Sequence, residues 1–441
     1  MDKYYLIKTY GCQMNIHESE KLAGMLRSLG YIETEEENKA DVVVFNTCCI
    51  RDGAEQKIYA HIGALKGLKK QKPNLIVAIC GCMTQIKSRP ETIKKKFPFV
   101  NIIFGTHNLN EFKTYLENYN ANKKYICDIW DEAKYINEDV ETYRTSNNNA
   151  WVNISYGCNN FCTYCIVPYV RGRERSRSFD DIIKECKQAI KDGYQYITLL
   201  GQNVNSYGND IDDSKVTFAN LLRAVADLDG DFRLKFMTNH PKDLSEEVVD
   251  VIATHPKIAK VIHLPLQSGS NKILKAMNRK YTTEDYMRLI DMIRAKVPNC
   301  YISTDIIVGF PGETEEDFLD TYNLLDKIKY DGVFAFMYSK RDGTVAASMD
   351  NQVDQKVKNE RVNKLLTLTK QITKDKNKES IGQEYNVYIE QYDDQNNAYI
   401  TKTDSGKTII VEEHADNLDK KKFYIVKVVK FYKNKLYGEI I

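Results

Sequence analysis

The sequence predicts an α/β protein of three parts: an N-terminal doubly wound α/β domain, a central (β/α) barrel, full or partial, and a small all-β barrel. Three observations predict it. Short apolar runs alternate with helix-like segments over residues 1–120, six strand-then-helix units follow over residues 150–375, and the pattern becomes strand-like from Tyr385 onward. A chain of 441 residues is long enough for several domains, and its 42% hydrophobic content excludes wholesale disorder.

In the N-terminal part, residues 1–120, continuous apolar runs such as DVVVFNT are typical of buried parallel strands. Helical periodicity predicts helices over His17–Leu29 and Ala54–Lys70. Residues 121–149 are polar and end in SNNN, which predicts a linker. The expected strands are Tyr4–Tyr10, Asp41–Thr47, Leu75–Cys80 and Asn101–Gly105.

In the central part, residues 150–375, the spacing between expected strands leaves room for one βα unit each, as in a barrel whose chemistry gathers at the carboxyl ends of its strands. The charged segment Val353–Lys378 predicts an amphipathic helix, and residues 376–441 predict the small β domain. The central strands are expected to begin near Trp151, Tyr196, Arg233, Val261, Tyr301 and Val333.

The charge balance, 63 basic against 61 acidic residues, excludes a histone-like polycation but leaves room for a local basic face. No basic segment followed by an apolar one opens the chain, and no apolar run approaches about 18 residues, so we expect a cytoplasmic protein without a membrane span. Eleven cysteines without an export signal favour metal or redox chemistry over disulfides.

Cys158, Cys162 and Cys165 form a C-x3-C-x2-C loop directly after the first expected barrel strand, WVNISYG. Three thiolates can hold three irons of a 4Fe–4S cube and leave the fourth iron open to a substrate. The alternative is a zinc loop, but zinc usually needs a fourth Cys or His nearby and a second C-x2-C pair, which we do not find. The pattern therefore favours an iron–sulfur cluster.

A second cysteine set, Cys12, Cys48 and Cys82, follows three successive strands of the N-terminal domain, in TYGCQMN, FNTCCIR and AICGCMTQ. Because parallel strands end at one edge of a sheet, we expect the three to converge and to hold a second cluster with an open iron. The alternative is that they pack as small hydrophobic residues. Cys49 and Cys80 compete for assignment as neighbours, although Cys80 lies within an apolar strand. The other cysteines are expected to be structural or incidental: Cys127, Cys186 and Cys300.

The barrel cysteine loop resembles that of the radical S-adenosylmethionine (SAM) superfamily, as do LLGQNVNSYG (199–208), FMTNHP (236–241), HLPLQSGS (263–270) and STDIIVGFPGET (303–314). In that superfamily the open iron binds the amino and carboxylate groups of SAM, and one electron cleaves SAM to methionine and a deoxyadenosyl radical. Singly, these segments could be turns or surface polar residues, but they recur at expected strand ends. The resemblance implies SAM contacts from Gln202, Ser268, Asp305, Gly309, Pro311, Gly312 and Glu313.

TYGCQMN, NTC-x-IR and GCM-x-Q, followed by GC-x3-C-x2-C, resemble the methylthiotransferase family over essentially the whole chain. That resemblance implies two 4Fe–4S clusters, a radical SAM core and a C-terminal TRAM domain. TYGCQMN, NTC-x-IR and VPYVRGRERSR are most similar to the branch that converts isopentenylated adenosine at tRNA position 37 to its 2-methylthio derivative, with one SAM for the methyl group and one for the radical. Cys49 departs from the serine usual there.

Two alternatives stay open. The first is a family member acting on threonylcarbamoyl-adenosine in tRNA or on an aspartate of a ribosomal protein. The second is a non-catalytic RNA-binding or iron-sensing protein, against which two open-iron triads argue, because a structural cluster gains nothing from a missing ligand.

The stretch RGRERSR places four arginines at alternate positions, where an extended segment would turn them to one face for phosphate contacts. The alternative is a solvated charge run or ion pairs to Glu174. The family resemblance implies as partners the tRNA anticodon loop, an electron donor and the iron–sulfur assembly machinery, and we expect a monomer that binds no membrane. The candidate RNA-binding residues are Arg171, Arg173, Arg175 and Arg177.

Overall fold

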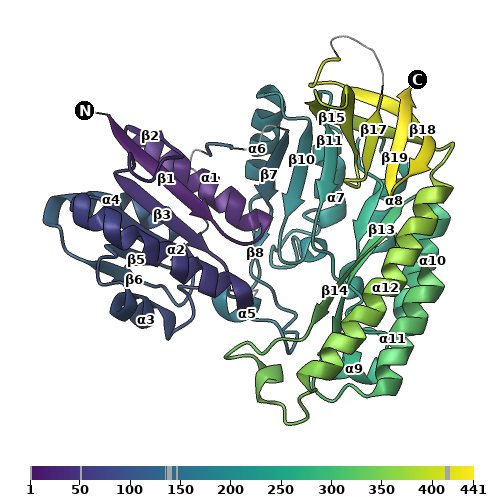
Figure 1. The fold of residues 1–441 in the computed structure, drawn as a ribbon, viewed down its shortest axis with the longest axis horizontal. Coiled ribbons are helices and arrows are strands. Elements are labelled where there is room, and N and C mark those ends of the chain that lie inside the picture. The colour runs from purple at the N-terminus through teal and green to yellow at the C-terminus, as the bar shows by residue number, and fades with distance from the viewer. Residues whose placement is uncertain (1, 50–51, 135, 137–141, 146–147, 413–417) are drawn as a thin grey trace. The chain divides into compact units, whose positions relative to one another are not determined.

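The computed structural model describes the chain except residues 1, 50–51, 135, 137–141, 146–147 and 413–417 (Figure 1). It contains two compact units. One comprises Met1–Phe161, Cys165–Ile182 and Leu200–Gln202, and the other comprises Cys162–Tyr164, Ile183–Leu199 and Asn203–Ile441. Among the described residues, no helix combines the length and the apolar character that crossing a membrane requires.

The N-terminal domain is a parallel six-stranded sheet of order β2-β1-β3-β4-β5-β6 (Figure 1). One core cluster packs α1 and α4 on one face of the sheet, and another packs α2 and α3 on the other, so the predicted doubly wound domain is confirmed. The strands β3 and β4 are buried along their whole length, which explains their continuous apolar sequences. The bounds are β1 Lys3–Thr9, β2 Tyr31–Glu33, β3 Val42–Thr47, β4 Ile76–Gly81, β5 Ile102–Phe104, β6 Ile126–Asp128, α1 Gln13–Ser28, α2 Asp52–Gln71, α3 Arg89–Lys96 and α4 Phe112–Asn122.

The prediction of a linker over residues 121–149 needs a correction at its start. There, β6 pairs with β5 in the sheet, and Ile126 and Ile129 pack against the domain core. The edge strands β2 and β6 were not predicted, because each has only three residues and, unlike the equally short β5, neither is a continuous apolar run.

All six strands predicted for the central part are present, each beginning within two residues of its expected start. Parallel pairing joins β10 to β11 and β12 to β13 to β14, in open sheets among the described residues, so the barrel is partial rather than full. The bounds are β7 Asn149–Asn153, β8 Ser155–Tyr156, β9 Arg175–Ser176, β10 Tyr196–Leu200, β11 Arg233–Phe236, β12 Val261–His263, β13 Tyr301–Val308, β14 Gly332–Met337, α5 Val167–Val170, α6 Phe179–Lys191, α7 Phe218–Ala226, α8 Glu246–Thr254, α9 Asn271–Ala276, α10 Thr283–Lys296 and α11 Glu315–Ile328.

The predicted charged helix is α12 (Gln355–Glu379), which packs against β14 and α11 and buries one stripe that includes Arg361 and Leu365. After it, five strands close into a small barrel of order β15-β16-β17-β19-β18 around an aliphatic core, as the alternating pattern predicts (Figure 1). Its strands are β15 Glu384–Asp393, β16 Ala398–Thr403, β17 Thr408–Val411, β18 Phe423–Tyr432 and β19 Lys435–Ile440.

Candidate functional site

Three cysteines follow the carboxyl ends of adjacent strands in the N-terminal sheet. Cys12 follows β1 and begins α1, Cys48 follows β3, and Cys82 follows β4. The backbone at Gly11 has φ +119°, and a Cβ there would lie 2.6 Å from the Cβ of Cys48. Only glycine therefore lets the Cys12 loop approach the Cys48 loop this closely.

The third loop is fixed against the second in the same way. Gly81 has φ +96°, and a Cβ there would lie 2.4 Å from the carbonyl oxygen of Thr47. The backbone N–H of Cys82 donates to that same oxygen at 2.9 Å. The backbone thus brings together the three loops that carry the predicted ligands.

A network of buried polar side chains holds these loops in place from within the domain. The Asn15 amide nitrogen donates to the carbonyl oxygens of Tyr10 (2.7 Å) and Thr47 (3.0 Å), which ties the first loop to the second. The Asn15 side-chain oxygen accepts a hydrogen bond from Arg171 at 2.8 Å, and Arg171 forms an ion pair with Glu18 at 2.5 Å. Asn15, Glu18 and Arg171 are each at most 4% exposed, so the network is part of the interior.

The thiols themselves are mostly buried, at 3% exposure for Cys48 and 2% for Cys82. A hydrogen bond with Cys49 and the positive charge of Arg171 outweigh burial and lower the pKa of Cys82 to about 7. Cys49 thus lies beside Cys82, and the structure leaves it a competitor for the role expected of Cys48. Cys80, by contrast, is fully buried in the core of the sheet, as predicted.

Three thiolates are the kind of ligand that an iron–sulfur cluster takes. Within the described ranges, no group of three His, Cys, Asp or Glu side chains is close enough to hold one metal ion. A 4Fe–4S cube takes one thiolate per iron, so its ligands stand further apart than those of zinc. The remaining cysteines differ in burial: Cys186 is buried, Cys300 is half-buried and Cys127 is exposed.

The barrel cysteine loop is held by backbone hydrogen bonds along its length. The N–H of Cys158 donates to the carbonyl of Gly172 at 3.2 Å, and the N–H of Thr163 donates to that of Met277 at 3.1 Å. Cys162 is 9% exposed, and Arg279 donates to its sulfur at 3.4 Å. One sulfur of the loop is therefore already engaged by a cation.

Buried polar atoms without a hydrogen-bond partner recur in the segments that resemble SAM-binding strands. Buried groups of this kind are uncommon and often mark a ligand site, and the amine, carboxylate, hydroxyl and adenine groups of SAM could satisfy them. The residues of these segments therefore fit the cofactor. Among the described residues these atoms are Gln202 Oε1, Asn203 Oδ1, both amide atoms of Asn205, Asn239 Oδ1, His240 Nε2 and Gln267 Oε1.

His240 illustrates what sequence reasoning missed within those segments. Burial and the positive charge of Arg279 lower the pKa of His240 to about 2, so its ring is neutral. Its Nδ1 accepts a hydrogen bond from the backbone of Lys242 at 3.2 Å, which places the ring hydrogen on Nε2. His240 therefore presents a buried, unpartnered donor.

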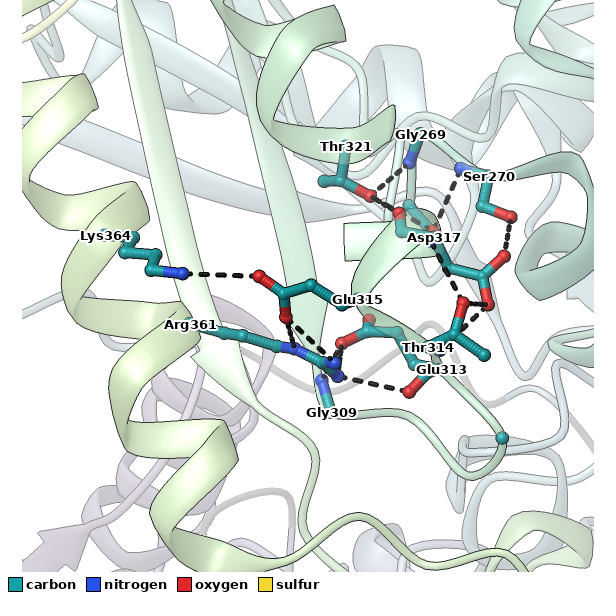
Figure 2. A network of polar contacts seen from close by, with 12 residues as sticks. Gly269, Ser270, Gly309, Glu313, Thr314, Glu315, Asp317, Thr321, Arg361 and Lys364 are labelled. Carbon is teal, nitrogen blue, oxygen red and sulfur yellow. Dashed lines mark hydrogen bonds and ion pairs between the residues drawn. The ribbon is translucent and has the colours of Figure 1, made fainter. Parts of the chain in front are cut away.

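Two of the predicted SAM contacts are engaged within the protein (Figure 2). Glu313 accepts hydrogen bonds from the backbone N–H of Gly309 at 2.8 Å and from Arg361 of α12 at 2.7 Å. Burial raises the pKa of Glu313 to about 7 against both of these contacts. The carboxyl group of Glu313 therefore shapes the glycine-rich loop after β13 rather than projecting away from it.

The neighbouring loop is built in a similar way (Figure 2). Asp317 closes a capping box with Thr314 at the start of α11 and accepts from the Ser270 hydroxyl at 2.7 Å. Ser268 is fully buried, and its hydroxyl lies 3.4 Å from that of Thr321. Ser268 is therefore also held by the fold.

The other predicted contacts lie on or beside β13. Asp305 is half-buried and lies 3.4 Å from the imidazole of His263. Pro311 is buried in the same loop, and the N–H of Gly312 donates to the carbonyl of Asn351 at 2.7 Å. None of these observations assigns a SAM contact, so the seven contacts stay predictions.

The four arginines of RGRERSR do not share one solvent face. Arg171 is 4% exposed, and Arg177 is 3% exposed and donates to the carbonyl of Asn153. Arg173 is exposed and lies over the ring of Phe161. Because only two residues of the stretch form a strand, the alternation expected of an extended segment fails. Burial excludes phosphate contacts by Arg171 and Arg177 in this conformation, and Arg173 and the half-buried Arg175 remain the candidates.

Comparisons with known proteins agree with this architecture. Residues 152–325 match the Radical SAM superfamily, and residues 4–105 match the uncharacterized protein family UPF0004. The chain is 49% identical over 436 residues to the tRNA-2-methylthio-N(6)-dimethylallyladenosine synthase of Clostridium tetani, covering 99% of this chain and 96% of that one. It is 50% identical to the enzyme of the same name from Thermoanaerobacter pseudethanolicus, over 92% of this chain and 84% of the relative.

Among solved structures, the radical SAM methyltransferase TsrM from Kitasatospora setae superposes with a TM-score of 0.58 at 14% identity, covering 78% of this chain and 75% of that chain. The cobalamin-dependent radical SAM enzyme OxsB superposes with a TM-score of 0.51 at 13% identity, covering 84% and 56%. At these identities the likeness concerns the fold alone.

Proposed function

This chain belongs to the family of the tRNA-2-methylthio-N(6)-dimethylallyladenosine synthases, and we propose that it places a methylthio group on carbon 2 of isopentenylated adenosine 37 in tRNA. The observation that carries the proposal is the presence of two cysteine triads, one at the carboxyl edge of the N-terminal sheet and one in the barrel loop. Carbon 2 carries an unactivated C–H bond and no leaving group, so ordinary acid–base chemistry cannot replace its hydrogen.

Two 4Fe–4S clusters and SAM are the groups that such a reaction needs, and the cysteine sets fit one cluster each. When bound, these groups supply a radical that removes the hydrogen atom from carbon 2, and they supply the sulfur atom and the methyl group that take its place. Cys158, Cys162 and Cys165 would hold the first cluster, and Cys12, Cys48 and Cys82 the second. The protein's part is to hold these thiolates, to orient SAM through the unpartnered polar atoms and to exclude water.

The inner face of the last barrel strand supports a place for the substrate base. Alternate residues of a strand point to opposite faces, and Met337 accepts a hydrogen bond from Gln355 of α12 on the outer face. Phe334 and Phe336 therefore face inward, yet they are 54% and 44% exposed. Two exposed aromatic rings inside a barrel are unusual and offer a stacking surface for a purine.

Polar groups beside these rings complete the fit to an isopentenylated adenine. Phe334 pairs in register with Asp305, and its ring packs at 6.0 Å on the ring of His263. His263 also contacts Ser303 through Nδ1 at 3.0 Å. Asp305 thus offers a carboxylate acceptor suited to the N6–H of an adenine, and Phe336 on the same face as Phe334 offers apolar surface suited to its five-carbon chain.

The chain's partners follow from the same proposal. Reaching a base in the anticodon loop requires that the base leave its stack, and exposed Arg173, together with lysines of the C-terminal barrel, could hold the phosphates. The C-terminal barrel resembles a TRAM domain. An electron donor and the iron–sulfur assembly machinery are the further partners, and we expect the enzyme to act as a monomer.

The test is an anaerobic reaction with iron, sulfide, reductant, SAM and isopentenylated tRNA that lacks methylthio groups, followed by digestion and mass spectrometry. We expect the methylthio nucleoside with this tRNA and none with tRNA lacking the isopentenyl group. Parallel reactions with threonylcarbamoyl-adenosine tRNA and with ribosomal protein cover the alternatives. Modification of either of these instead would overturn the substrate, and deoxyadenosine without any modified product would leave only the radical SAM core.

A further inference from the structure

We propose that Arg279 is a positioning residue for the barrel cluster: its buried charge and its hydrogen bond to Cys162 stabilise the cluster's negative charge and so raise its reduction potential. This inference rests on the proposed cluster in the barrel loop. It does not depend on the identity of the final substrate.

The guanidinium of Arg279 is fixed on three sides. Its Nη1 donates to the sulfur of Cys162 at 3.4 Å, its Nη2 to the carbonyl of Pro265 at 3.0 Å, and its Nε to the hydroxyl of Tyr281 at 2.9 Å. The Tyr281 hydroxyl in turn donates to the carbonyl of Leu266 at 2.8 Å. At 8% exposure, Arg279 has no other orientation open to it without breaking these contacts.

The charge of Arg279 lacks an acidic partner. Arginine is always protonated in proteins, and a buried charge is costly unless an opposite charge lies beside it. Two other buried arginines have such partners, Glu18 for Arg171 and Glu313 for Arg361. For Arg279, the described residues supply no carboxylate within ion-pair distance, and the group it contacts that becomes anionic in a cluster is the sulfur of Cys162.

The consequence is a bias toward the reduced cluster. Adding one electron adds one negative charge, and a fixed positive charge in a water-poor site favours the more negative state. Hydrogen bonds to cluster sulfurs act in the same direction and are a recognised determinant of iron–sulfur potentials. Arg279 therefore eases electron entry into the barrel cluster, the step on which radical formation depends.

Two substitutions test the charge. Arg279→Gln removes the charge and, because its amide nitrogen reaches only as far as the Nε of Arg279, also removes the donor to the Cys162 sulfur. Arg279→Lys keeps the charge but loses the planar guanidinium that makes three separate hydrogen bonds. Arg233→Gln is the matched control, because Arg233 lies in the same barrel and its charge is paired with Asp404. All variants are made in the full chain with the N-terminal cysteines Cys12, Cys48, Cys49 and Cys82 changed to Ala, so that only the barrel cluster titrates.

The measurements are iron and sulfide content, circular dichroism of the folded protein, and a redox titration followed by electron paramagnetic resonance, all without tRNA. We expect Arg279→Gln to reduce the reduced-to-oxidised ratio at a given potential about tenfold, which is 59 mV for one electron. Arg279→Lys should lose less, and Arg233→Gln should match the parent. An unchanged potential in a loaded Arg279→Gln variant would overturn the proposal.

A failure to load iron is also decisive. Loss of the cluster in Arg279→Gln with retention in Arg279→Lys supports the proposal, because Arg279→Lys keeps the positive charge that Arg279→Gln removes. Loss in both variants with an intact fold assigns Arg279 a purely structural role and overturns the proposal. The parent protein, which lacks the four N-terminal cysteines, can load and titrate its barrel cluster even if the wild type modifies no tRNA. In that case the proposed function fails, but the reduction potentials of the variants still test the role of Arg279.

Discussion

The two cysteine sites are built in different ways although each rests on a buried arginine. The N-terminal site gathers its thiols from three loops, and its arginine, Arg171, is neutralised by Glu18. The barrel site takes its thiols from one loop, and its arginine, Arg279, contacts Cys162 without an acidic partner among the described residues. Arg171 is thus shared between a carboxylate and the Cys82 thiol, whose pKa it lowers, whereas no carboxylate of the described residues shares the charge of Arg279 with Cys162.

The largest expected effect is the loss of deoxyadenosine formation when a cysteine of the barrel loop is replaced. Cys162→Ala removes a ligand of the proposed barrel cluster, so deoxyadenosine formation from SAM should fall to background. Cys186→Ala is the control, because Cys186 is fully buried but lies outside both sites. Deoxyadenosine from both variants is measured by liquid chromatography and mass spectrometry. Substantial deoxyadenosine from a Cys162→Ala protein would remove the barrel cluster from the account.

The second prediction concerns the scaffold role of Arg171. Arg171→Met leaves Glu18 buried without its partner, which should lower the free energy of unfolding of the first unit by about 3–5 kcal/mol. Adding Glu18→Gln to that variant should recover much of the loss. Urea unfolding of the metal-free protein measures both effects. An Arg171→Met protein as stable as the wild type would show that the ion pair does not hold the loops.

The third prediction tests the proposed place of the base. Phe334→Ala together with Phe336→Ala should weaken binding of an isopentenylated anticodon stem-loop about tenfold or more, because base stacking on an aromatic side chain contributes about 1–3 kcal/mol. Binding of the unmodified stem-loop should change less. Fluorescence anisotropy gives both affinities, with Met337→Ala on the outer face of the same strand as the control. Equal losses for the two RNAs would refute a role in selecting the isopentenyl group.

The smallest effect concerns the capping network beside the glycine-rich loop. Burial alone would raise the pKa of Asp317, but hydrogen bonds from Lys272, Ser270 and Thr314 outweigh it and lower the pKa to about 2. A carboxyl group with a lowered pKa stabilises the fold above its unfolded pKa, and this stabilisation is lost as the pH falls from about 4 toward 2. Asp317→Asn should therefore cost stability at pH 6 and little at pH 2 in urea unfolding. An equal loss of stability at both pH values would contradict a lowered pKa of Asp317.

The sequence predicted the elements that carry long periodic patterns and the loops that end them. Six of the central strands and the cysteine positions after β1, β3 and β4 were readable, because apolar periodicity and parallel topology determine them, whereas the two-residue strand β9 was not. The supporting arginines were not readable in the same way. Arg171 and Glu18 are 153 residues apart in the sequence, and Arg279 and Cys162 are 117 residues apart. Local sequence patterns carry no information about contacts at such separations.

The same limit explains where the environment of candidate residues differs from expectation. Alternation in RGRERSR predicted one exposed face, but tertiary contacts bury Arg171 and Arg177. Glu313 stays a predicted SAM contact, but its hydrogen bond with Arg361, far along the chain on α12, could not be read from the sequence. The unpartnered atoms of Asn239 and Gln267 lie within segments that the sequence did single out, but only burial distinguishes them from their neighbours.

The most direct measurement of the central claim uses a full-length protein in which Cys12, Cys48 and Cys82 are all changed to Ala. It is supplied anaerobically with reductant, SAM and isopentenylated tRNA, and deoxyadenosine and methylthio nucleoside are measured together by mass spectrometry. We expect that deoxyadenosine still forms and that the methylthio nucleoside does not. Methylthio nucleoside at the wild-type level would contradict a division of labour between the two cysteine sites.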